Sequence, residues 1–201
     1  EELDLKLRFC DIFAASDRKQ ARIGYDEAMG IIRADARIEK RMHLLDSKNR
    51  FTDGRSRAFL EAISADAGTQ HGRTPVFALV DELHAWKKRE LYDVIRTGLV
   101  KVPGSLIMVI TTAGRGQENV AADLIDYARK VARGEVDDPS VLPILFEARQ
   151  DEDWTDEAVW HRVNPGLAYG YPDIEGLRQL AREAREKPAD REAFRQLHLN
   201  V

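Results

Sequence analysis

Two runs of five apolar residues, at positions 76–80 and 106–110, constrain the fold of this chain more than any other feature. Continuous apolar runs of this length are typical of strands buried on both faces of a parallel sheet. Between them, residues 87–97 are expected to form a helix that ends near Gly98. A strand, a helix and a second strand in this order predict an α/β fold with a mostly parallel sheet flanked by helices.

The neighbouring segments continue this alternation of strands and helices. Residues 7–15 are expected to contain a strand, and Asp17, with Gln20 three residues later, is a candidate N-cap for the helix that follows it. Further strands are expected at residues 59–64 and 142–146. These elements predict an α/β domain over residues 1–150.

The remaining segments show other patterns. Residues 40–57 are polar and are expected to be irregular, with a turn or hairpin loop at 50–57. Residues 151–201 contain only short helical patterns, and one of these helices is expected to start at Asp173 and end at Pro188. A chain of 201 residues has the length of one domain with a small appendage. We therefore expect a helical tail at residues 151–201.

Composition excludes several classes of protein. Lys and Arg number 31 and Asp and Glu number 35, which gives a net charge of −4 and excludes a generally basic nucleic-acid coat. A local basic patch stays possible at Arg50, Arg55 and Arg57, although a solvated loop is the favoured interpretation. The single cysteine, Cys10, excludes a disulfide framework. No apolar run approaches the about 20 residues that cross a membrane, so no membrane partner is expected.

Two carboxylates, Asp81 and Glu82, directly follow the first apolar run. In open α/β sheets, ligands bind beyond the carboxyl ends of the strands, which would place both side chains at the edge of a site. An aspartate there can hold Mg²⁺, and the next residue can orient or deprotonate an attacking water. The simpler alternative is that the pair caps the following helix.

Two hydroxyl side chains, Thr111 and Thr112, follow the second apolar run. At the tip of a neighbouring strand they could contact the terminal phosphate of a nucleotide or the attacking water. Threonine also simply favours strands, so the pair is informative mainly together with Asp81 and Glu82.

Residues 80–86 resemble the Walker B motif of phage large terminase subunits, and residues 110–114 resemble motif C of that family. The similarity extends in order along nearly the whole chain, through residues 14–21, 63–67, 89–98, 160–166 and 194–200. The resemblance implies a P-loop ATPase that couples ATP hydrolysis to the translocation of double-stranded DNA into a procapsid. It implies a magnesium ligand at Asp81, a catalytic carboxylate at Glu82 and coupling residues at Thr111 and Thr112. Arg115, just past motif C, is a candidate phosphate contact.

The family also implies ATP and Mg²⁺ as cofactors and several partners. These are double-stranded DNA, the small terminase subunit, the portal protein of the procapsid and further copies in a homo-oligomeric ring. A virus- or prophage-encoded protein of this kind acts in the cytoplasm of the bacterial host.

The chain departs from the family pattern in one respect. It has no Gly-x-x-x-x-Gly-Lys-Ser/Thr sequence, which forms the phosphate-binding Walker A loop. In the family, that loop precedes the strand expected at residues 7–15, and a nuclease domain follows the helical tail. We therefore expect an internal piece of a terminase that is N-terminally incomplete, and weak or absent ATP hydrolysis by this piece alone.

Three alternatives stay open at this point. Asp-Glu-x-His at residues 81–84 also fits a superfamily 2 helicase core, although the second domain of such enzymes has no counterpart in the short tail. A second alternative is a folded interaction fragment without enzymatic chemistry. A third makes Asp81 a nuclease ligand together with Asp123 or Asp126.

Overall fold

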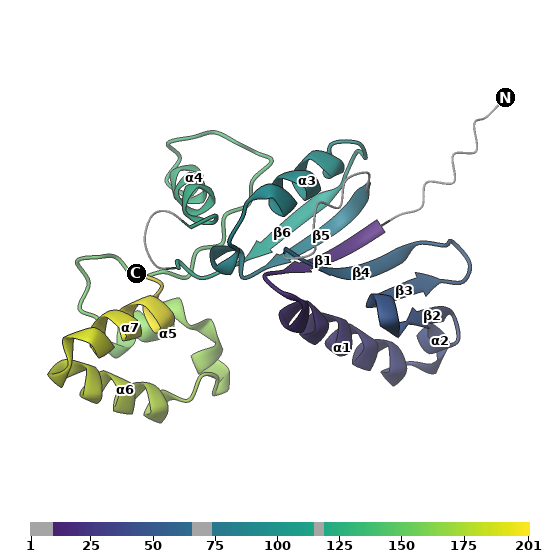
Figure 1. Cartoon of the computed structure of the whole chain (residues 1–201). Helices are drawn as coiled ribbons and strands as arrows, with labels where there is room; N and C mark the ends of the chain where they lie inside the picture. The colour runs from purple at the N-terminus through teal and green to yellow at the C-terminus, as the bar shows by residue number, and fades with distance from the viewer. Residues whose placement is uncertain (1–9, 66–73, 115–118) are drawn as a thin grey trace. The chain divides into compact units, whose positions relative to one another are not determined.

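The computed structural model of the chain describes residues 10–65, 74–114 and 119–201 (Figure 1). Its contacts divide the chain into two compact units, Glu1–Thr111 and Thr112–Val201. The first unit contains the sheet and the second contains the helices α4 to α7. The sequence-based domain boundary after residue 150 stays a prediction, because a division by contacts does not test independent folding.

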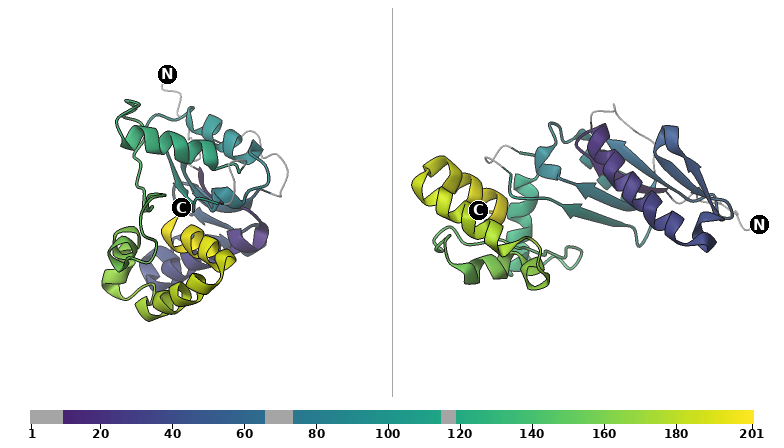
Figure 2. Two further views of the ribbon diagram at one scale, coloured as in Figure 1. Left: turned by 90° about the vertical axis from the view of Figure 1, so that its left-hand side faces the viewer. Right: turned by 90° about the horizontal axis from the view of Figure 1, so that it is seen from below.

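The first unit is a six-stranded sheet in the order β2-β3-β4-β1-β5-β6, in which β4, β1, β5 and β6 are parallel. Helix α1 packs against β1 and β4, and α3 packs against β5 and β6, on opposite faces of the sheet (Figures 1 and 2). The predicted mostly parallel α/β fold is therefore confirmed. The bounds are β1 (Cys10–Ala15), α1 (Arg18–Ala34), α2 (Ala36–Glu39), β2 (Met42–Leu45), β3 (Arg50–Asp53), β4 (Phe59–Ser64), β5 (Pro75–Asp81), α3 (Glu90–Leu99) and β6 (Leu106–Ile110).

Asp17 is the N-cap of α1, as its sequence context predicts. Its side chain accepts hydrogen bonds from the backbone N–H groups of Lys19 and Gln20, at 2.8 and 3.0 Å. These bonds satisfy two of the donors that the first turn of a helix leaves unpaired. The cap starts α1 directly after β1 and so fixes the first turn of the helix at the carboxyl end of that strand.

The prediction that residues 40–57 are irregular is wrong over its central part. Strands β2 and β3 form an antiparallel pair there, and only residues 54–56 form the expected turn. Phe51 is 1% exposed and stacks on Tyr25 of α1, with ring centroids 4.4 Å apart. Arg41 forms an ion pair with Asp53 at 2.5 Å. Strands of only four residues give a weak sequence pattern, and contacts distant in sequence stabilise them here.

Two predictions about strands beyond β5 need correction. β6 forms where expected, but Leu106, Met108 and Ile110 are 47–54% exposed, so the strand is not buried on both faces. It pairs with β5 along one edge, and within the described residues no strand pairs with its other edge. The strand expected at residues 142–146 does not form, and that segment has no regular structure. Apolar content alone does not supply a pairing partner.

Two glycines of α1 provide a matched test of how closely this helix packs on the sheet. A Cβ atom at Gly24 would lie 2.5 Å from the ring of Phe13, whereas one at Gly30 would meet nothing within 4 Å. We expect Gly30→Ala to stabilise the protein by about 0.5–1 kcal/mol, because alanine favours the helix. We expect Gly24→Ala to destabilise it, because overpacking costs about 1–3 kcal/mol. Urea unfolding followed by circular dichroism measures both; equal effects would contradict the close packing of α1 on β1.

The second unit consists of α4 (Ala122–Ala132), α5 (Glu157–Val163), α6 (Ile174–Glu186) and α7 (Pro188–Leu199). Asp156 and Asp173 cap α5 and α6, the latter as predicted. A common core holds α5, α6 and α7 together, and the helical tail expected at residues 151–201 is thereby confirmed. Its larger buried side chains are Val159, Trp160, Val163, Leu167, Leu177, Phe194 and Leu199.

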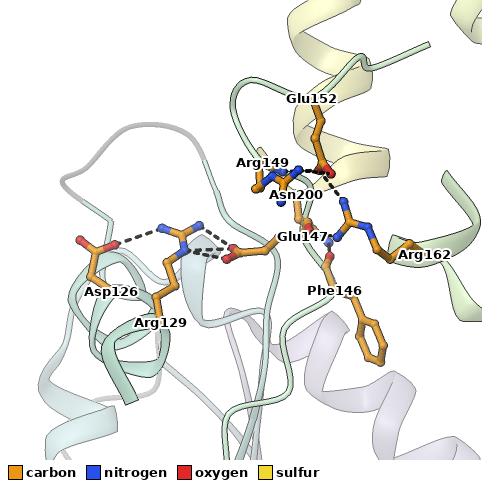
Figure 3. Close-up of polar contacts among 8 residues, drawn as sticks. All are labelled: Asp126, Arg129, Phe146, Glu147, Arg149, Glu152, Arg162 and Asn200. Carbon is orange, nitrogen blue, oxygen red and sulfur yellow. Dashed lines mark hydrogen bonds and ion pairs between the residues drawn. The ribbon is translucent and has the colours of Figure 1, made fainter. Parts of the chain in front are cut away.

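Ion pairs attach the segment between α4 and α5 to helices on both sides (Figure 3). The single Nε–H of Arg129 in α4 is shared between the two carboxylate oxygens of Glu147, each 3.0 Å away, and Nη2 donates to one of these oxygens at 2.7 Å. Nη1 of Arg129 pairs with Asp126. Arg162 of α5 donates to the backbone carbonyl of Glu147 at 3.1 Å and forms an ion pair with Glu152. Glu147 is therefore held from α4 through its side chain and from α5 through its backbone.

His198 is expected to make the stability of α5–α7 depend on pH. Partial burial lowers the pKa of its imidazole, so the folded state disfavours the protonated ring. A base with a lowered folded-state pKa loses stability as the pH falls below its unfolded value of about 6.5. We expect the free energy of unfolding of α5–α7 to decrease as the pH is lowered from 7.5 to 5.5. This decrease should be smaller in His198→Gln. Hydrogen exchange at both pH values measures this; the same pH dependence in both proteins would contradict it.

Candidate active site

The carboxyl end of β5 holds Asp81 at the edge of the sheet. In the first turn of α1, Gln20 donates from Nε2 to the Asp81 carboxylate at 3.3 Å. The indole N–H of Trp86, which is 3% exposed, donates to the Asp81 carbonyl at 3.0 Å. Gln20 therefore holds the side chain of Asp81, and the buried Trp86 holds its backbone carbonyl.

Glu82 leaves the line of the strand. Its backbone is left-handed, with φ 50° and ψ 47°, a conformation that costs a residue with a side chain roughly 1–2 kcal/mol. Its N–H donates to the carbonyl of Ile110 at the end of β6, at 2.8 Å. Strain of this kind persists only where the surroundings fix it, and it is concentrated at functional sites.

The environment of Glu82 favours proton uptake by its carboxylate. Partial burial raises its pKa, the nearby His84 opposes this rise, and Asp81 adds to it. A carboxylate with a raised pKa is closer to the value that suits a general base at neutral pH.

Thr111 and His84 complete the described cluster. The hydroxyl oxygen of Thr111 accepts the backbone N–H of His84 at 3.1 Å and lies 3.1 Å from the Nδ1 atom of its ring. The same Nδ1 atom lies 2.9 Å from a carboxylate oxygen of Glu82. Asp81, Glu82 and Thr111, all expected at the site, therefore gather at the carboxyl ends of β5 and β6.

Two other candidates are not described at this cluster. Thr112 is the first residue of the second unit. Arg115 lies outside the described residues. The sequence analysis also missed two members of the cluster. It treated Gln20 only as part of a capping sequence and His84 only as part of the alternative helicase motif, because their contacts join positions distant in sequence.

The helix-cap interpretation of Asp81 and Glu82 is wrong. Helix α3 begins only at Glu90, and the residues directly after the pair form a short 3-10 helix over Leu83–Ala85. The Glu82 side chain makes no capping hydrogen bond to that 3-10 helix. The pair therefore has no role in starting α3.

The oxygen ligands at this edge suit magnesium better than a transition metal. Mg²⁺ is usually held by one or two carboxylates, with waters and phosphate oxygens completing the octahedron, and Asp81 provides such a carboxylate. Across residues 10–65, 74–114 and 119–201, no group of three or more His, Cys, Asp or Glu side chains could hold a metal ion. Asp126, one of the two residues that the nuclease alternative would combine with Asp81, forms an ion pair with Arg129 in the second unit. No helix among those described is long and apolar enough to span a membrane.

The parallel sheet, with an Asp-Glu pair at the end of one strand, has the features of the P-loop ATPase class. A sequence model of the family "Terminase large subunit, ATPase domain" matches residues 5–130, and the chain belongs to this family. This membership favours the terminase interpretation over the helicase alternative.

Individual relatives agree with this assignment. The large terminase subunit of Enterobacteria phage HK97 is 26% identical over 191 residues, covering 94% of this chain and 37% of that protein. Protein YmfN of Escherichia coli K12 is 29% identical over 133 residues, covering 65% of this chain and 28% of YmfN. The crystal structure of the HK97 large terminase shares the fold, with a TM-score of 0.84 at 24% identity over 96% of this chain and 40% of that one. The chain thus spans little more than a third of the length of its HK97 relative.

Proposed function

We propose that this chain is part of the ATPase of a viral DNA-packaging motor, which couples ATP hydrolysis to the translocation of double-stranded DNA into a procapsid. The observation that carries the proposal is the meeting of Asp81, Glu82 and Thr111 at the carboxyl ends of β5 and β6. Membership of the terminase ATPase family supports it.

Each side chain has a role in this proposal. Asp81 holds the magnesium ion that accompanies ATP, and this ion neutralises charge on the phosphates. Glu82 orients the attacking water and accepts its proton, because its carboxylate is strand-terminal and its pKa is raised. Thr111 and Thr112 couple ATP hydrolysis to the movement of DNA. Arg115 contacts phosphate, either in its own subunit or in a neighbouring one.

The partners follow from the packaging role. They are double-stranded DNA, the small terminase subunit, the portal protein and further copies of the large subunit in a ring, in the cytoplasm of the bacterial host. Phosphate binding needs a glycine-rich loop and a lysine, and the 201 residues contain no such sequence. We therefore propose that the chain on its own hydrolyses ATP weakly or not at all.

The test is Mg²⁺-dependent ATP hydrolysis, with and without double-stranded DNA, by this chain and by a longer protein in which a Walker A segment precedes it. Hydrolysis by the longer protein that rises with DNA and is lost in Asp81→Asn would support the motor. A longer protein that folds, binds no nucleotide and hydrolyses none would overturn it and leave the interaction-fragment alternative.

A further inference from the structure

We propose that His84 is a positioning residue that links the Glu82 carboxylate to Thr111, so that the orientation of the proposed base depends on the end of β6. This inference deepens the proposed function and rests on it for its catalytic consequence. The link itself is a property of the folded chain and can be tested without nucleotide.

Short contacts define the link. The Nδ1 atom of His84 lies 2.9 Å from Glu82 and 3.1 Å from the Thr111 hydroxyl, and the His84 backbone N–H donates to that hydroxyl at 3.1 Å. The turn that carries His84 is anchored on both sides by buried side chains, since Leu83 is 0% and Trp86 is 3% exposed. The ring is therefore presented from a fixed backbone.

The chemistry of a neutral imidazole makes the two contacts of Nδ1 mutually exclusive as hydrogen bonds from one proton. When Nδ1 carries the proton, it can donate to the Glu82 carboxylate oxygen 2.9 Å away or to the Thr111 hydroxyl oxygen 3.1 Å away, and the ionised carboxylate is the stronger acceptor of the two. When Nε2 carries it, Nδ1 can only accept, and the Thr111 hydroxyl can donate to it. The Nδ1–H tautomer is therefore the one that holds the ionised Glu82.

The end of β6 contacts Glu82 by two routes. The Glu82 N–H donates to Ile110, and the Glu82 side chain reaches the next residue, Thr111, through His84. The Thr111 hydroxyl contacts both the backbone N–H and the ring Nδ1 atom of His84. A displacement of Thr111 would therefore turn the His84 ring relative to Glu82. Because Thr111 and Thr112 are the proposed coupling residues, this link joins the proposed base to the residues that would respond to hydrolysis.

The first experiment measures the tautomer of His84 in this chain by side-chain ¹⁵N NMR above about pH 8, where an ordinary imidazole is neutral. We expect the Nδ1–H tautomer in the wild-type chain and a shift towards Nε2–H in Glu82→Gly. Glycine suits the left-handed backbone at this position and removes the carboxylate, so this variant is expected to fold. His161 on α5 serves as the unchanged control. An Nε2–H tautomer in the wild type, or no response to Glu82→Gly, would overturn the link.

The second experiment measures ATP hydrolysis in the longer protein. His84→Asn keeps a donor close to the Nδ1 position, whereas His84→Leu removes it. We expect His84→Leu to lower kcat about 10- to 100-fold with little change in KM, as for loss of a hydrogen bond to a charged group, and His84→Asn to restore most of it. Equal losses in both variants, or a change in KM alone, would contradict a positioning role. A wild-type protein that hydrolyses no ATP would instead refute the proposed function, and the NMR result would still decide the link.

Discussion

Replacement of Glu82 by Gln is expected to lower the rate of ATP hydrolysis about 10²- to 10⁴-fold in a protein that also carries the phosphate-binding segment. Glutamine keeps the size of the side chain and can still accept a hydrogen bond, but it cannot take a proton from water. Because Asp81 and the sheet are unchanged, binding of Mg²⁺-nucleotide should persist. The measurements are kcat and the equilibrium binding of a fluorescent ATP analogue.

Glu90→Gln is the matched control for this prediction. Glu90 is an exposed glutamate at the start of α3, eight residues further along the chain. We expect this variant to hydrolyse ATP at the wild-type rate. Comparable losses in both variants, or a loss of nucleotide binding that explains the whole effect of Glu82→Gln, would contradict the role of Glu82 as the base.

Phe194→Ala is expected to produce the largest loss of stability in the second unit. Phe194 is 3% exposed and packs against the rings of Trp154 and Trp160, with centroids 5.7 and 5.5 Å away. Truncation of a buried phenylalanine typically costs about 3–5 kcal/mol, through lost burial and the cavity that remains. Hydrogen exchange across α5–α7 measures the free energy of opening, and tryptophan fluorescence reports on the same core.

Leu197→Ala on the same helix separates core packing from helix propensity. Leu197 is 59% exposed, so its truncation should change the free energy of opening by only about 0.5 kcal/mol. If the two variants differed by less than about 1 kcal/mol, the assignment of Phe194 to the centre of this core would be wrong.

The sequence was most informative where local pattern and tertiary environment agree. β5 forms over the apolar run at residues 76–80, and β4 forms over residues 59–64, where a strand was expected. The N-cap at Asp17 formed as expected because its hydrogen bonds join residues two and three positions apart. Asp81 lies at the end of the predicted strand for the same reason, because β5 forms over a local apolar pattern.

Features that depend on distant partners were beyond single-sequence reasoning. β3 is held by the stacking of Phe51 on Tyr25, which is 26 positions away. The contact of His84 with Thr111 spans 27 positions and that of Gln20 with Asp81 spans 61. Conversely, residues 142–146 have the composition of a strand but no strand forms there, because apolar content does not determine pairing.

The most direct test of the central claim is a structure of the longer protein with Mg²⁺ and a non-hydrolysable ATP analogue. The account predicts the terminal phosphate at the carboxyl ends of β5 and β6, with Mg²⁺ bound by Asp81 directly or through water and the Glu82 carboxylate facing the attacking-water position. Nucleotide bound elsewhere, with Asp81 and Glu82 contacting neither metal nor phosphate, would contradict it.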